Sequence, residues 1–249
     1  MICNWRWSST EPYVGKGTTV TPDTLKLTAE LVARVHRHVD DSGPLAGTTY
    51  LTEADYDQIT DQLLAEQSEG ESVWLFAYGS LIWKPEFPHL EERLATARGW
   101  QRSFCIRLKR WRGTSDCPGL MMALDRGGEC RGVALRLSDA SAAESIGKYV
   151  RRELSAKPPS QVPRWIAAET TEGPVQAIAI VSNPDGQNYV GNLPIEEAAQ
   201  TLSKACGHWG SGAEYLRNTV IHLEKRGIRD EYLWRLQELV ADRIASTFP

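Results

Sequence analysis

The sequence lacks the cysteine pattern of a disulfide-linked or zinc-binding protein. Its five cysteines are scattered along 249 residues, odd in number and never arranged as C-x-x-C, which is typical of a protein in a reducing compartment. The N-terminus also lacks the apolar segment of a signal peptide, and no stretch approaches the roughly 18 uncharged residues of a membrane-spanning helix. We therefore expect a cytoplasmic protein that is not embedded in a membrane.

The sequence has no excess of positive charge and none of the common cofactor motifs. Lys plus Arg is 28 and Asp plus Glu is 32, a net charge of −4, and no basic block could follow a nucleic-acid backbone. The motifs G-x-S-x-G, G-x-G-x-x-G and G-x-x-x-x-G-K-[ST] are absent. No histidine has an acidic or cysteine partner at metal-ligand spacing. We expect no nucleic-acid partner, no cofactor and no metal.

The pattern of apolar residues predicts helices at both ends of the chain and strands in the middle. Helical spacing is found from Thr24 to Val39, in a segment beginning at Thr52, and in three segments after Pro194, the first of which spans 195–210. Between Val73 and residue 182, short apolar runs alternate with Gly, Asp and Pro turns, which indicates a mixed or antiparallel sheet. One helix, ending near Glu153, interrupts these strands. The fold class is therefore α+β.

The segment VWLFAYGSLIWKP, residues 73–85, breaks an apolar run with Tyr78-Gly79-Ser80 before it resumes at Leu81. Gly leaves room for a ligand to approach the backbone, and Ser adds a hydroxyl, so the break could be a loop that accepts an anionic group. It could equally be a β-bulge or tight turn after a core strand. The segment alone leaves both interpretations open.

Glu153 lies at the end of the interposed helix, beside Arg151 and Arg152 and before a Pro-Pro pair. The helix dipole disfavours a carboxylate there, so this position suits a catalytic base. We expect partial burial and the helix end to raise its pKa, and the two arginines to offset part of that increase. The alternative is a solvated Glu balanced by its neighbours.

Two other segments are assigned to structural roles. Met121 and Met122, adjacent in a predicted strand, are most simply core packing. The sequence DRGG at 125–128 is most simply a hairpin turn between two strands.

Taken together, an ordered set of motifs resembles the ChaC-like gamma-glutamylcyclotransferase family. They run from about residue 73 to the C-terminus, and their order makes the set far more specific than any one member. The motifs are F-A-Y-G-S-L-I-W-K-P at 76–85, R-G-W-Q-R-S-F at 98–104, P-G-L-M-M-A-L-D-R-G-G at 118–128, C-R-G-V-A-L-R-L at 130–137, R-R-E-L at 151–154, V-P-R-W at 162–165 and A-E-Y-L at 213–216.

The resemblance implies a compact mixed β-barrel with flanking helices and a reaction that releases 5-oxoproline from a gamma-glutamyl amide, glutathione being the substrate associated with such proteins. It implies that Glu153 is the general acid and base, and that a tyrosine near the pocket is Tyr215. The substrate loop it implies consists of Tyr78, Gly79, Ser80 and Leu81. Some members have R-E-K-G-G-Y where this chain has R-E-L-S-A-K-P-P, which affects the pocket wall and so the choice of substrate.

The resemblance also suggests how the chain is divided. We expect an irregular arm at 1–20, a helical extension packed on the domain at 21–70, and the cyclotransferase-like domain at 71–249. Two other functions stay open: a cyclotransferase acting on other gamma-glutamyl amines or amino acids, and a non-catalytic module that binds a small amino-acid-like ligand. The sequence does not indicate the oligomeric state.

Overall fold

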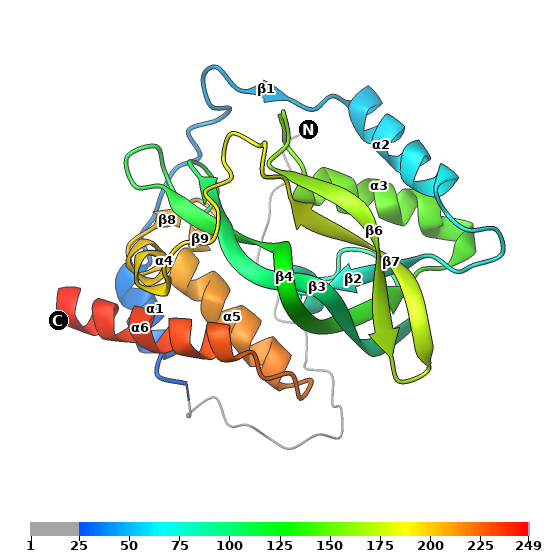
Figure 1. The fold of residues 1–249 in the computed structure, drawn as a ribbon. Coiled ribbons are helices and arrows are strands. Elements are labelled where there is room, and N and C mark those ends of the chain that lie inside the picture. Colours follow the sequence, from blue (N-terminus) through cyan, green and yellow to red (C-terminus); the bar gives the residue numbers. More distant parts are fainter. Residues whose placement is uncertain (1–24, 249) are drawn as a thin grey trace.

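A closed β-barrel occupies the centre of the computed structural model, which describes residues 25–248 (Figure 1). The expected N-terminal arm, 1–20, lies outside these residues. The strands are ordered β2, β4, β3, β6 and β7 around the barrel, and a parallel pairing of β2 with β7 closes it. The barrel strands are β2 (Trp74–Ala77), β3 (Glu91–Leu108), β4 (Gly119–Arg136), β6 (Gln161–Thr170) and β7 (Gly173–Ser182).

Strands β3 and β4 are much longer than the short apolar runs suggested, and the predicted hairpin turn at 125–128 is wrong. Both strands contain 18 residues and pair with each other on both sides of the DRGG segment. The register shifts there because Gly127 and Gly128 have positive φ angles of 118° and 56°. Two glycines in conformations that other residues rarely adopt therefore form a bulge within β4.

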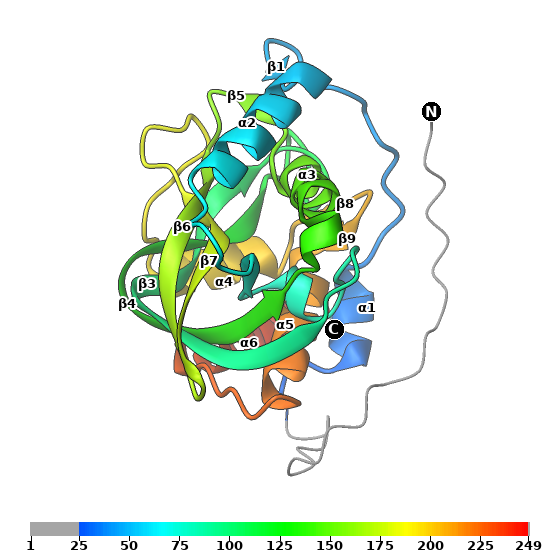
Figure 2. The same ribbon diagram turned by 90° about the vertical axis from the view of Figure 1, so that its right-hand side faces the viewer.

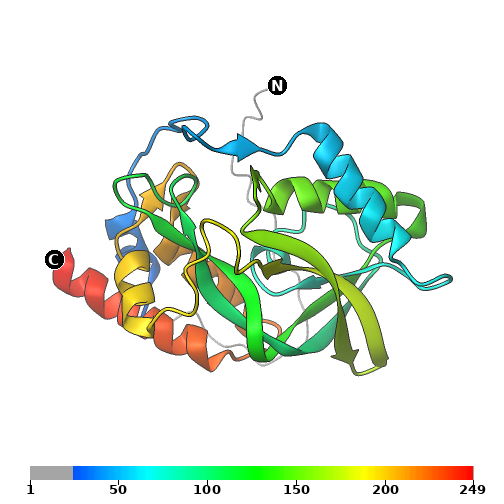
Figure 3. The ribbon, with the colours of Figure 1, turned by 45° about the horizontal axis from the view of Figure 1, so that its top comes forward.

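Two groups of helices flank the barrel, as Figures 1 and 3 show. Helices α2 and α3 pack together on one side, and α1, α4 and α5 each contact α6 on the other. The helices are α1 (Ala29–Val35), α2 (Glu53–Ala65), η2 (Ser80–Ile82), η3 (Asp139–Ser141), α3 (Ala142–Glu153), α4 (Ile195–Leu202), α5 (Gly212–Glu224) and α6 (Glu231–Thr247).

Helix α1 begins later and ends earlier than the apolar spacing from Thr24 to Val39 predicted, since it spans only Ala29–Val35. The Thr28 side chain accepts a hydrogen bond from the Leu31 N–H and caps the helix. Leu25 and Leu27 are buried outside the helix, and the Leu27 N–H donates to the Gln237 side chain of α6. The first part of the predicted helix is therefore a capped approach segment, held by a contact far away in the sequence.

The described part of the expected extension, residues 25–70, packs on the barrel domain. Strand β1 (Thr49–Tyr50) pairs antiparallel with β5 (Ala156–Lys157), and α2 lies along α3 (Figure 2). We propose on these contacts that the chain is divided near residue 70 into an extension and a domain.

The predicted helix over 195–210 is wrong beyond Leu202, because a small antiparallel pair, β8 (Cys206–Gly207) and β9 (Gly210–Ser211), follows it.

No helix within residues 25–248 has both the length and the apolar character needed to cross a lipid bilayer.

Candidate active site

The Tyr78–Leu81 loop begins where strand β2 ends. All four β2 residues are buried, and Gly79 caps the short helix η2 that follows. Gly79 has a negative φ, so the backbone conformation does not require glycine here. Glycine is instead needed for lack of room: a Cβ at this position would lie 2.8 Å from the Tyr215 hydroxyl and 3.1 Å from Met122 Cε. A side chain at position 79 would therefore displace two other pocket residues, Tyr215 and Met122.

Glu153 is the last residue of helix α3, and its side chain is only 16% exposed. Burial raises the pKa of this carboxyl. The Arg152 guanidinium, whose Nε lies 3.0 Å from Glu153 Oε1, lowers the pKa in part, whereas the nearby Glu86 carboxylate raises it. The direction of the shift is the expected one, with burial as its main cause.

Only one of the two arginines balances Glu153. Arg151 points away from it and pairs with Glu53 and Asp57 on α2, at 2.8 and 2.9 Å. Arg152 instead donates to Ser80 Oγ at 2.8 Å and to the Lys84 carbonyl, in addition to its contact with Glu153. It thereby joins the carboxylate to the Tyr78–Leu81 loop.

Three tyrosines surround the carboxylate. Burial raises the pKa of Tyr78, Tyr149 and Tyr215, and the charge of Glu153 raises each further. The Tyr78 hydroxyl donates to the Ile180 carbonyl at 2.8 Å, and the Ile180 N–H donates to the Tyr149 hydroxyl at 3.2 Å. These phenols therefore stay neutral at physiological pH, as polar groups that add no charge beside Glu153.

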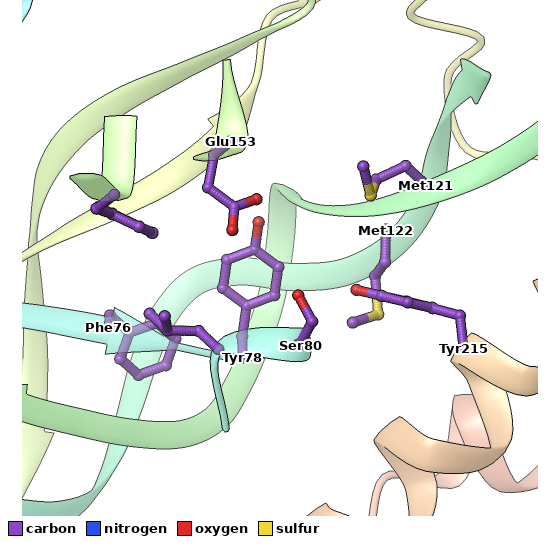
Figure 4. A pocket seen from close by; sticks show the side chains of 10 residues that line it. Phe76, Tyr78, Ser80, Met121, Met122, Glu153 and Tyr215 are labelled. Atoms are coloured by element: carbon purple, nitrogen blue, oxygen red, sulfur yellow. The ribbon is translucent and has the colours of Figure 1, made fainter. Parts of the chain in front are cut away.

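A pocket of about 310 Å³, part of it open to solvent, brings the predicted site residues together. Glu153 and Tyr215 enter from different elements, with Tyr78 and Ser80 between them, in Figure 4. All six predicted residues line the pocket, with four others, Phe76, Met121, Met122 and Tyr149.

The sequence interpretation missed these four pocket residues. Met122 is buried, as expected of a core residue, yet both Met121 and Met122 also face the pocket. Tyr149 lies four residues before Glu153, a spacing that places both side chains on the same helix face and could have identified it. Phe76 belongs to a fully buried strand and carries no comparable signal.

Arg102 of β3 binds the backbone at the start of the Tyr78–Leu81 loop. Its side chain is 2% exposed, and Nε donates to the Tyr78 carbonyl at 2.7 Å. The same guanidinium pairs with Asp230 at 2.8 Å and donates to the Arg131 carbonyl, so all three of its nitrogens have partners. A buried ion pair thus fixes the backbone at the point where β2 becomes the loop.

Within residues 25–248, no group of three or more His, Cys, Asp or Glu side chains is arranged to hold a metal ion.

Comparisons with known proteins agree on one family. Residues 73–243 match the model of the ChaC-like protein family. The chain is 33% identical to the glutathione-specific gamma-glutamylcyclotransferase of Escherichia coli K12, over 75% of this chain and 80% of that protein. It is 29% identical to gamma-glutamylcyclotransferase 2-3 of Arabidopsis thaliana, over 68% and 88%.

A solved structure supports the fold. The crystal structure of a gamma-glutamylcyclotransferase specific to glutathione from yeast superposes with a TM-score of 0.62 at 19% identity, covering 69% of this chain and 97% of that one. At this identity the likeness supports the barrel and its flanking helices, the expected α+β architecture.

Replacing Arg102 by Met should lower the free energy of unfolding by about 3 kcal/mol, because the Asp230 carboxylate loses its buried partner. The matched control is Arg98→Met, in the same strand. Arg98 is 64% exposed and pairs with exposed carboxylates, so its loss should cost less than about 1 kcal/mol. Urea denaturation of both variants measures the difference, and equal losses would contradict an anchoring role for Arg102.

Proposed function

This chain belongs to the ChaC-like family, and we propose that it cleaves glutathione to 5-oxoproline and Cys-Gly. The chain is a gamma-glutamylcyclotransferase. The observation that carries the choice of mechanism is the position of Glu153, a largely buried carboxylate that lines one pocket with the Tyr78–Leu81 loop and whose pKa is raised by burial. A relative 33% identical over most of both chains is named for glutathione, and this supports the choice of substrate.

The proposed reaction needs no nucleophile from the protein. The α-amine of the gamma-glutamyl group attacks its own γ-carbonyl, a new C–N bond closes a five-membered ring, and the C–N bond to the cysteine nitrogen breaks. Intramolecular attack in a held geometry can reach effective molarities of about 10⁵ M or more. The largest task of the pocket is therefore to fold the glutamyl group so that the amine faces the carbonyl.

Glu153 would carry both proton transfers. The α-amine is protonated near neutral pH, so the carboxylate removes a proton before the attack and returns one to the departing cysteine nitrogen. Acid–base assistance of this kind contributes roughly 10² to 10⁴ in rate and works best when the pKa of the group approaches the working pH. Burial of Glu153 shifts its pKa in that direction.

The Tyr78–Leu81 loop would hold the glutamyl group. Gly79, Ser80 and Leu81 line the pocket together with Glu153, and their backbone N–H groups would bind the α-carboxylate or the oxyanion that develops on the γ-carbonyl. Tyr215, whose hydroxyl lies over Gly79, would close the opposite wall. Its phenol stays neutral because burial raises its pKa.

The proposal includes a cytoplasmic location and independence from metals and cofactors. The four cysteines within the described residues, Cys105, Cys117, Cys130 and Cys206, are all free thiols, which suits a reducing compartment. The substrate brings its own nucleophile and Glu153 provides the proton transfers, so the chemistry requires no further group.

Replacing Glu153 by Gln should abolish nearly all release of 5-oxoproline, because an amide cannot accept the proton of the α-amine. A raised carboxyl pKa means that ionised Glu153 destabilises the folded state above that pKa, so the variant should unfold no more easily than wild type at pH 8. Glu144→Gln, an exposed position on the same helix, is the control. Near-normal turnover by Glu153→Gln would remove Glu153 as the base.

The rate should fall in acid as Glu153 becomes protonated. Because its pKa is raised from 4.5, the acidic limb of kcat/KM against pH should lie above that value, and the fraction of active enzyme decreases as the pH drops through it. A limb centred at 4.5 or below would show that the titrating carboxyl is not buried. Circular dichroism at each pH separates titration from unfolding.

Glutathione should be turned over at least about tenfold more efficiently than gamma-glutamyl-alanine in kcat/KM, a difference of about 1.4 kcal/mol in transition-state binding. Mass spectrometry of 5-oxoproline from both substrates measures the ratio. A reversed ratio would favour a cyclotransferase for other gamma-glutamyl compounds, and no product from either would favour a binding module.

A further inference from the structure

Residues 49–65, comprising β1 and α2, bind the chain on both sides of Glu153. Before it, Arg151 pairs with Glu53 and Asp57 of α2. After it, the Tyr56 hydroxyl donates to the Leu154 carbonyl at 3.0 Å. This clamp segment, as we call residues 49–65, lies outside residues 73–243, which match the family model.

The contacts continue along the backbone that leaves the pocket. The Leu51 N–H donates to the Ser155 carbonyl at 2.9 Å, and β1 then pairs with β5 in the register Tyr50 to Ala156 and Thr49 to Lys157. Figure 2 shows β1 beside β5 and α2 along α3. The residues directly after Glu153 are thus bound to the clamp segment one after another.

These contacts matter because Glu153 ends its helix. The last carbonyls of an α-helix have no partner within the helix, and the ends fray unless other groups bind them. Leu154 is the C-cap of α3, and its carbonyl accepts a hydrogen bond from the Tyr56 hydroxyl. The side chains at the helix end also differ in direction: Arg151 pairs with α2, whereas Arg152 pairs with Glu153, which lines the pocket.

We propose that the clamp segment positions the catalytic carboxylate, with Tyr56 and Leu51 as positioning residues that touch neither substrate nor Glu153 itself. They hold the carbonyls of Leu154 and Ser155, so that the helix end cannot turn the Glu153 side chain toward solvent. This inference rests on the proposed role of Glu153 in the reaction.

The first test is Tyr56→Phe, which removes the hydroxyl and keeps the ring. Tyr50→Phe is the matched control: it lies in the clamp segment and keeps the backbone pairing of β1 with β5, and the hydroxyl that it removes accepts from the Leu45 N–H instead of binding the residues after Glu153. With glutathione as substrate, Tyr56→Phe should lower kcat about tenfold with KM within about twofold, because misplacement of a catalytic group costs rate and not binding. Equal kcat values for the two variants would overturn the proposal.

The acidic limb of the pH profile gives a readout that a merely structural role would not move. The groups facing Glu153 are Arg152 and Tyr149 of its own helix, Glu86, Tyr78 and Tyr215, and Tyr56→Phe changes none of them. If the helix end loosens in Tyr56→Phe, the Glu153 carboxyl becomes more exposed to water, and the increase in its pKa that burial causes becomes smaller. The limb should therefore move to lower pH in Tyr56→Phe and stay in place in Tyr50→Phe.

A second pair of variants tests the backbone contact. Leu51→Pro removes the N–H that binds the Ser155 carbonyl, whereas Leu51→Ala keeps the N–H and shortens the side chain. The clamp predicts the larger loss of kcat in the proline variant. A larger loss in Leu51→Ala would mean that side-chain packing alone matters at this position.

A measurement without substrate keeps the inference separate from the proposed function. Carbon-13 NMR titration of the Glu153 carboxyl should give a lower pKa in Tyr56→Phe than in wild type. An unchanged pKa would overturn the clamp even if glutathione is cleaved. Absence of 5-oxoproline from the wild-type protein would instead overturn the proposed function, whatever the NMR titration gives.

Discussion

The pocket depends on keeping the Glu153 carboxylate largely out of water while leaving it able to ionise. Burial alone would favour the protonated form, and an isolated buried charge is too costly to persist. The Arg152 guanidinium at 3.0 Å provides a compensating charge, and Glu86 beyond it opposes that effect. A fully solvated Glu would be too weak a base at neutral pH, so this balance is what makes one carboxylate useful in both directions of proton transfer.

The candidate site was predictable where its chemistry lies in local sequence patterns. Glu153 and Tyr78–Leu81 belong to short motifs whose order along the chain indicated a family, and the pocket contains all of them. Arg102 lies within one of those motifs, but its role was not predictable, because its partners Asp230 and the Tyr78 carbonyl are distant in sequence. Contacts between residues that are far apart in the sequence cannot be read from the spacing of its apolar residues.

The fold was predictable at the level of helices and strands, and less so at their ends. Composition and turn residues gave the α+β class, whereas closure into a barrel came from the resemblance. The DRGG segment at 125–128 has the composition of a turn, yet the pairing of β4 with β3 on both sides makes it a bulge. Leu25 and Leu27 fit a helical stripe, but the Thr28 cap and the bond from Leu27 to Gln237 start the helix later. Strand pairing decides the first case, and a local cap together with a tertiary contact decides the second.

Tyr78 and Tyr149 serve both the pocket and the neighbouring strand β7. The pairing of β2 with β7 ends at Ile178. Beyond the end of that pairing, the Ile180 N–H donates to Tyr149 and its carbonyl accepts from Tyr78. Buried backbone groups require such partners, so Tyr78 and Tyr149, two of the three tyrosines that line the pocket, also satisfy the backbone of β7. Replacing either by a smaller apolar residue would therefore disturb the barrel as well as the site.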